Sequence, residues 1–303
     1  MPERDEHMPG LNARRDGYIP GVPCWVDASE PDPEAAAEFY GGLFGWELED
    51  TMPPEAPGKY FMARLRGLDV AAVGSIPEGA PPIAMWNTYF WVDSADESAS
   101  KVRDAGGSTV MEPFDVMDAG RMAFMTDSEG AAFGLWQAKE NRGAQLVNDP
   151  GALNLNALNT RDVEGAKSFY GSVFGWGVLD LSPGPLMWTL PGFGDFLERD
   201  NPDLRKEMVA AEAPEGFEDV VAMITPIGDD QPDTPPHWSA IFATDDADAA
   251  AAKTTELGGQ VIVPPFDAPW VRMTVLADPQ GATFIASKFV PENKNLGGGP
   301  EAR

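Results

Sequence analysis

The chain has 303 residues, 43% of them hydrophobic and 23% charged, which is the composition of a globular protein long enough for two domains that each bury a core. Twenty-one basic residues against 49 acidic ones give a net charge of −28, so nucleic acids and anionic membrane surfaces are disfavoured as partners. No apolar run approaches the roughly 18 residues of a membrane span, and the polar first residues lack a signal-peptide pattern, which predicts a cytoplasmic protein.

A charged leader at 1–17 is expected to be disordered, and a first module is predicted over 18–140. Its first strand, at 22–26, has apolar neighbours around the single cysteine, Cys24, which favours a buried hydrophobic role over a nucleophilic one. A helix follows, because Asp32 can cap it and Pro33 suits its first turn. Its apolar side chains recur at helical spacing and must pack on a sheet: Phe39, Tyr40, Leu43 and Phe44. Two further strands are predicted at 60–65 and 70–75.

The second half of this module repeats the same order. A helix at 94–105 ends at Gly106-Gly107, since glycine adopts the left-handed conformation without steric cost. The strands around it are predicted at 87–92, near 109, at 121–126 and at 132–137. A linker at 141–152 then leads to a second module at 153–290, which carries an insertion near 195–220, and a disordered tail is expected at 291–303.

Internal repetition supports this division. The motif from Phe39-Tyr40 to Phe44-Gly45-Trp46 returns 130 positions later, from Phe169-Tyr170 to Phe174-Gly175-Trp176. Farther on, Arg121-Met122 returns as Arg272-Met273, 151 positions later. The predicted fold class is therefore α+β, with two tandem modules that each contain paired βαβββ units.

The repeated motif, the Gly-Gly helix ends and the turns at 127–130 and 278–281 resemble the glyoxalase/bleomycin-resistance/dioxygenase superfamily, also called vicinal oxygen chelate proteins. The resemblance covers nearly the whole chain. It implies a cupped mixed sheet around a cleft in each module. The chain looks similar to tandem actinobacterial members, including the 27 kDa antigen type, and less closely to accessory proteins of anthracycline biosynthesis.

The same resemblance locates the places where metal-using relatives carry their ligands. These places fall on Gly21, Asn87 and Gly134 in the first module and on Leu155, Ser239 and Ile285 in the second. A divalent ion needs three or four imidazole, thiolate or carboxylate donors, and these sets offer one amide and one hydroxyl. We therefore predict no metal and no other cofactor.

In place of metal ligands, the predicted clefts contain aromatic side chains. Alternation along the strand at 87–92 places Thr88, Phe90 and Val92 against the helix and turns the intervening residues toward the cleft. The candidate ligand-binding residues are Trp25, Asn87, Tyr89, Trp91, Arg121, Trp136, Trp188, Ser239, Trp270 and Arg272. Such rings stack on flat ligands, although they also fill cores. For the two arginines, a structural salt bridge is favoured over a contact with an anionic ligand. The first module, with more aromatic residues, is the favoured binding module.

The predicted function is metal-independent binding of a small, flat, hydrophobic molecule, aromatic or conjugated, in antibiotic resistance or as an accessory to biosynthesis. One alternative is a metal-free enzyme of natural-product biosynthesis or detoxification, with His237 or Tyr89 transferring a proton. Another is a glyoxalase similar to lactoylglutathione lyase. A monomer or weak homodimer is expected, because tandem modules supply within one chain the contact that single modules make between chains.

Overall fold

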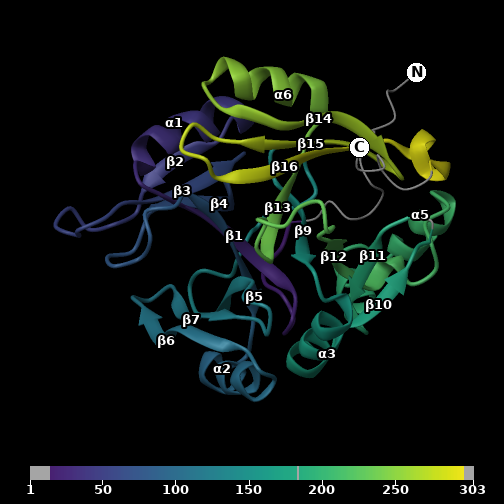
Figure 1. The fold of residues 1–303 in the computed structure, drawn as a ribbon, viewed down its shortest axis with the longest axis horizontal. Coiled ribbons are helices and arrows are strands. Elements are labelled where there is room, and N and C mark those ends of the chain that lie inside the picture. The colour runs from purple at the N-terminus through teal and green to yellow at the C-terminus, as the bar shows by residue number, and fades with distance from the viewer. Residues whose placement is uncertain (1–13, 183, 297–303) are drawn as a thin grey trace.

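The computed structural model describes residues 14–182 and 184–296, and in these residues the chain forms two eight-stranded mixed sheets with helices on one side of each (Figure 1). The strands of the first sheet follow the order β2 (Glu47–Asp50), β3 (Tyr60–Leu65), β4 (Leu68–Ser75), β1 (Pro23–Glu30), β5 (Met85–Trp91), β8 (Ala132–Ala138), β7 (Gly120–Thr126) and β6 (Ser108–Val116). The second sheet has the same topology: β10 (Gly177–Asp180), β11 (Leu186–Thr189), β12 (Val220–Pro226), β9 (Leu153–Thr160), β13 (His237–Ala243), β16 (Thr283–Phe289), β15 (Val271–Ala277) and β14 (Gln260–Ala268). The α+β class and the tandem of repeated units are confirmed.

Four long helices occupy matching places in the two modules: α1 (Pro33–Phe44), α2 (Ala95–Asp104), α3 (Val163–Phe174) and α6 (Ala247–Glu256). The predicted start of α1 is confirmed. The Asp32 carboxylate accepts a hydrogen bond from the backbone N–H of Ala35, and Gly45 ends the helix with a φ of 71°. Asp162 and Gly175 do the same for α3. The inserted segment of the second module holds α4 (Phe193–Leu197), α5 (Leu204–Ala210) and the short 3-10 helix η1 (Phe217–Asp219).

The two modules do not bury separate cores, although the chain is long enough for them. One cluster joins Phe90 and Phe133 of the first module to Phe169 and Trp176 of the second, and the other joins Tyr40 and its neighbours to Phe242 and Phe284. Strand β5 contacts β13 at the centre, α1 lies beside α6, and α2 lies beside α3. Each core thus contains residues from one half of the first module and one half of the second. The two modules therefore pack as a single unit.

Hydrogen bonds cross between the modules in matching pairs. The Tyr40 hydroxyl donates to Asp278 Oδ2 at 3.1 Å, and the Tyr170 hydroxyl donates to Asp127 Oδ2 at 2.9 Å. Both carboxylates also cap their own turns through three backbone N–H groups. The repeated tyrosine therefore joins the modules at two equivalent points.

Two segments expected to be disordered contain ordered residues. Within 14–17, Arg14 forms a β-bridge with Leu146 and Arg15 is buried, because the chain there is covered by the linker and by the inserted segment. At the other end, the 3-10 helix η2 (Pro291–Asn295) is held by an ion pair between Lys294 and Glu212. The rest of the predicted leader and tail, residues 1–13 and 297–303, lies outside the described residues.

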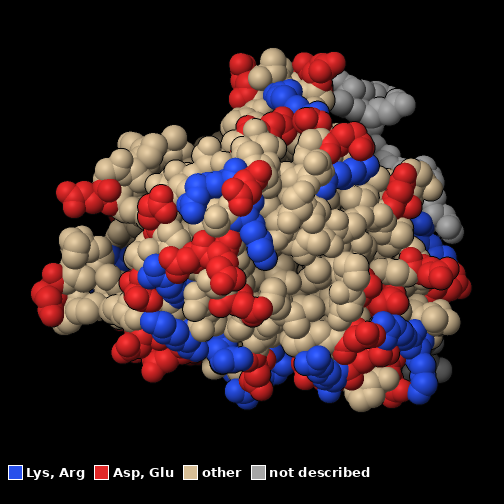
Figure 2. Space-filling model, turned by 90° about the horizontal axis from the view of Figure 1, so that it is seen from below, with Lys and Arg blue, Asp and Glu red and all other residues tan. Residues whose placement is uncertain are grey.

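The surface mixes the two signs of charge. Figure 2 shows Lys and Arg side chains interspersed with Asp and Glu on the face seen from below. Several are paired, such as Arg121 with Asp96 and Lys139 with Asp115. None of the helices in the described part of the chain is long and apolar enough to cross a membrane.

Candidate functional site

Each sheet has one face toward the helices and an opposite front face, which is where the sequence places the cleft. In the first module Tyr89 and Trp91 project to the front face, whereas Phe90 lies in the helix-side core, so the predicted alternation is confirmed. Trp25 and Trp136 join Tyr89 in one cluster, and all three are at most 7% exposed. The front face of this module is thus packed with rings.

The linker closes this face. The backbone N–H of Ala144 donates to the Cys24 carbonyl at 2.8 Å, and Trp136 Nε1 donates to the Asn141 carbonyl at 2.9 Å. The Arg142 guanidinium lies 5.7 Å from the centre of the Trp91 ring. Cys24 is a free thiol whose pKa is raised by burial, as expected for a packed hydrophobic residue. The rings of Trp25, Tyr89 and Trp136 are therefore enclosed by protein, whereas Trp91 is half-buried.

A buried carboxylate lies beneath these rings. Asp27 accepts hydrogen bonds from Asn87 Nδ2 at 2.8 Å, from the Tyr89 hydroxyl at 3.0 Å and from the Tyr60 hydroxyl at 3.1 Å. Trp25 Nε1 donates to the Tyr60 hydroxyl in turn, at 3.1 Å. Burial raises the pKa of Asp27, an effect that the three hydrogen bonds oppose. Burial also raises the pKa of Tyr89 well above its ordinary value, so this hydroxyl stays protonated and donates its hydrogen bond to Asp27.

The position of the first metal-ligand place needs a correction. Gly21 precedes β1 and packs on Phe174 and Trp176, away from the front face. The shift of 130 positions that relates β1 to β9 instead pairs Leu155 with Trp25. The ligand places of the first module are therefore Trp25, Asn87 and Gly134.

These residues do not fit a metal ion. Tyr89 occupies the space at Gly134, where a Cβ atom would stand 2.0 Å from Tyr89 Cδ1. Asn87 is engaged by Asp27 and Ser29, and Trp25 offers no ligand atom. Within residues 14–182 and 184–296 no group of three or more His, Cys, Asp or Glu side chains is arranged to hold a metal ion.

The second module differs because its front face carries smaller side chains at matching positions. Strand pairing sets Trp25 opposite Tyr89 in the first sheet and Leu155 opposite Ile241 in the second. It likewise sets Trp91 opposite Trp136 and Ala243 opposite Ser287. Three indoles and a phenol are thus replaced by Leu155, Ile241, Ala243 and Ser287, which leaves space on this face.

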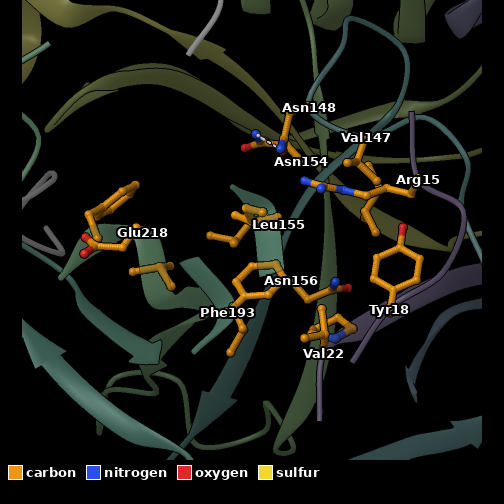
Figure 3. Close-up of a pocket in the computed structure, with 16 residues that line it drawn as sticks. Arg15, Tyr18, Val22, Val147, Asn148, Asn154, Leu155, Asn156, Phe193 and Glu218 are labelled. Carbon is orange, nitrogen blue, oxygen red and sulfur yellow. Dashed lines mark hydrogen bonds between the residues drawn. The ribbon is translucent and has the colours of Figure 1, made fainter. Parts of the chain in front are cut away.

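Two cavities occupy that space, each of about 100 Å³. The first cavity reaches Leu155 and lies between the N-terminal residues Arg15 to Pro23 and the inserted segment, including Phe193 and Phe217 (Figure 3). The second cavity is lined by Ala243 and Ser287. Asn148 and Asn154, joined by a 3.1 Å hydrogen bond, line both cavities. The cavities therefore lie where the first module has Trp25, Trp91 and Trp136.

The other predicted residues are distributed over three environments. Arg121 and Arg272 each form a two-point ion pair with the first turn of a helix, through Asp96 and Asp248, so both take part in structural salt bridges on the helix side. Trp188 is also on the helix side, fully buried against Tyr170, because β11 pairs in a register that turns Met187 to the front.

Ser239 and His237 stand on the front face of the second module. Asn159 Nδ2 donates to Ser239 Oγ at 2.9 Å. His237 is the first residue of β13, and its Nδ1 atom lies 2.8 Å from the Pro235 carbonyl oxygen. Trp270 lies in the turn between β14 and β15, with a φ of 69°, and stacks on Phe289. Ser239 and His237 are thus near each other, whereas Trp270 stands at the edge of the sheet.

Sequence reasoning missed Asp27, Tyr60 and Arg15. A two-residue period from Trp25 would have placed Asp27 on the front face, and the tyrosine lies in a strand that was predicted. Arg15 carried no signal, since a charged residue near a polar terminus is ordinarily solvated.

Comparison with known proteins agrees with this fold. The family model described as "Glyoxalase/Bleomycin resistance protein/Dioxygenase superfamily" matches residues 25–135 and 152–285. The chain is 41% identical over 286 residues to "Putative glyoxylase CFP32" of Mycobacterium tuberculosis, covering 92% of this chain and 99% of the relative. It is 34% identical over 282 residues to "Anthracycline biosynthesis protein DnrV" of Streptomyces peucetius, covering 88% and 93%. The chain belongs to the glyoxalase/bleomycin-resistance/dioxygenase superfamily, and it is similar to tandem members of that superfamily over nearly its full length.

Solved structures share the fold at low identity. The Mn(II)-bound glyoxalase of Novosphingobium aromaticivorans superposes with a TM-score of 0.56 at 16% identity, over 92% of this chain and 83% of that one. The 2,2',3-trihydroxybiphenyl 1,2-dioxygenase of Sphingomonas wittichii superposes with a TM-score of 0.53 at 14% identity, over 92% and 93%. At this identity the likeness extends to the fold alone.

Proposed function

We propose that the chain binds a small, largely apolar organic molecule on the front face of its second module, without a metal ion. The observation that carries the proposal is the exchange of Trp25, Trp91 and Trp136 for Leu155, Ala243 and Ser287, which coincides with the two cavities. Partly exposed apolar side chains such as Met223, Val275 and Ile285 continue the same face. Concave, mostly apolar surfaces with a few polar groups are the usual form of small-molecule sites.

The relatives favour a natural product as the molecule. Two proteins named for anthracycline biosynthesis are 33% and 34% identical to this chain. An anthracycline ring system is larger than a single cavity of about 100 Å³. We therefore propose that the ring system lies along the front face, with one edge in a cavity. The binding unit is one chain, because both cores are completed between its own modules.

The test is to fill the cavity. Leu155→Trp copies the residue of the first module, and we expect it to weaken binding of an anthracycline probe, daunorubicin, by tenfold or more, about 1.4 kcal/mol. Binding is measured by quenching of the intrinsic tryptophan fluorescence. Trp91→Leu, a half-buried position of the first module, is the matched control and should leave affinity unchanged.

The reverse pattern, with affinity lost in Trp91→Leu and retained in Leu155→Trp, would place the site in the first module and refute the proposal. Thermal unfolding of both variants separates loss of binding from loss of fold.

One observation favours turnover as a second function. The imidazole of His237 is fixed through Nδ1 by the Pro235 carbonyl, and within the described residues its Nε2 atom makes no hydrogen bond. A histidine held in this way has a fixed ring orientation, which suits it to transfer a proton to or from a bound compound. If the protein is an enzyme, His237→Gln should abolish conversion of the bound compound while leaving its affinity within about twofold, whereas equal losses of both would show a role in binding alone.

A further inference from the structure

The first cavity contains a buried positive charge. The side chain of Arg15 is 4% exposed, and Figure 3 shows its guanidinium extending from the N-terminal segment into the space between Asn154 and Leu155. Within the described residues its Nη1 atom has no hydrogen-bond partner. A guanidinium stays protonated in proteins, so the cavity holds a cation with donors to spare.

Neighbouring carboxylates leave this Nη1 donor unused. Asp200 Oδ2 forms an ion pair with Nη1 at 3.7 Å, which is beyond hydrogen-bonding distance, and the Asp200 side chain is 46% exposed to water. Glu218, the charged residue that shares the cavity lining, accepts a hydrogen bond from Arg205 Nε at 3.3 Å. The nearby Tyr18 hydroxyl donates to the Ala144 carbonyl. Burial lowers the pKa of Arg15, which expresses the same cost of desolvating the charge.

Most of the rest of the lining is apolar, and Asn148, Asn154 and Asn156 are its polar amides. The apolar part includes Leu155, Phe193, Leu197, Phe217 and Val221. A buried cation beside an apolar wall matches a molecule with an anionic oxygen at one end and hydrocarbon at the other. A single arginine and few other donors suit a carboxylate better than a phosphate, whose three oxygens need more hydrogen-bond donors.

We propose that the first cavity receives the carboxylate of a small organic acid, with one oxygen bound by Arg15 Nη1 and the hydrocarbon part against Leu155 and Phe193. This inference rests on the proposed function, because it assigns a ligand class to part of the same site. A volume of about 100 Å³ is somewhat less than an engineered cavity of about 150 Å³ that takes up benzene, so a single ring or a short chain is the largest part that enters.

The experiment compares benzoate with benzamide, which has nearly the same shape and no charge, by titration calorimetry of the full chain at pH 7. We expect benzoate to bind at least tenfold more tightly than benzamide. Arg15→Gln, and Arg15→Met as a second variant, should reduce that ratio to about one. Arg14→Gln is the matched control, because Arg14 is the adjacent arginine and its side chain is 65% exposed.

Three outcomes overturn the inference: no measurable binding of benzoate to the unmodified chain, equal binding of the two probes, or a preference for benzoate that survives in both Arg15 variants with intact thermal unfolding. Failure of the proposed function gives a different pattern. In that case Leu155→Trp still binds both probes as the unmodified chain does. If instead Leu155→Trp binds neither probe while Arg15→Gln keeps the benzoate-to-benzamide affinity ratio unchanged, the carboxylate site alone is refuted.

Discussion

Adding a methyl group at Gly134 tests whether the first module is closed. A Cβ atom there would stand 2.0 Å from Tyr89 Cδ1 and 2.4 Å from Cε1, so the phenol ring must move. The ring is buried and is held by its hydrogen bond to Asp27. Overpacking costs about 1–3 kcal/mol, and losing a hydrogen bond to a buried carboxylate adds about 1–3 kcal/mol. We expect Gly134→Ala to lower the free energy of unfolding by about 3–5 kcal/mol, measured by urea denaturation.

Two further variants isolate the cause. Gly171→Ala, in α3, meets only the Trp176 carbonyl at 3.4 Å, so it should be neutral or stabilising by up to about 1 kcal/mol. In a Tyr89→Ala background the clash is absent, and Gly134→Ala should then cost less than about 1 kcal/mol. An equal cost of Gly134→Ala in both backgrounds, or a cost below 1 kcal/mol in the unmodified chain, would refute the reasoning that Tyr89 occupies the family's carboxylate place.

Two other predictions concern the interface between modules and the paired arginines. Burial beside the carboxyl of Asp278 raises the pKa of Glu30 to about 9, so the folded chain keeps a proton that the unfolded chain releases near pH 4.5. The free energy of unfolding should therefore fall as pH rises from about 5 to 9, by at most about 1.4 kcal/mol per pH unit from this group. In urea denaturation, Glu30→Gln should show a shallower decline with pH. An unchanged decline in this variant would assign the pH dependence to other groups. Arg121→Ala removes a half-exposed ion pair with Asp96, which should cost about 0.5–1 kcal/mol in urea denaturation and leave ligand affinity unchanged, while a tenfold loss of affinity would restore Arg121 to the site.

The sequence predicted the fold because its signals repeat. The Phe39-Tyr40 motif and its return at Phe169 each carry a capping aspartate before and a glycine after, so two independent helices gave the same answer. Alternation was equally informative in β5, where Phe90 and Tyr89 lie on opposite faces as expected. The sharing of cores between modules had no such signal, because an apolar stripe on a helix does not say which sheet covers it.

The site was less predictable for reasons that lie in particular residues. Trp188 belongs to a four-residue strand, too short for alternation to fix its face, and it lies in the helix-side core. Arg121 and Arg272 occupy equivalent positions whether both bind a ligand or both bind an aspartate. Repetition alone therefore could not distinguish a binding role from a structural one. The count that led to Gly21 ran past the start of β1, where the pairing with β5 is irregular between Pro23 and Trp25.

The two modules together explain how one sheet can leave a cavity open in a stable chain. Burying a large side chain such as Trp25 or Trp136 contributes roughly 1.5–3 kcal/mol, so the closed front face of the first module adds stability that the second module forgoes at Leu155 and Ser287. Because both cores are shared, that stability supports the second sheet as well as the first. A front face that buries Arg15, with an Nη1 atom that lacks a hydrogen-bond partner and only the long ion pair to Asp200, is then tolerable, since the rest of the fold holds the side chain in place until a ligand anion binds it.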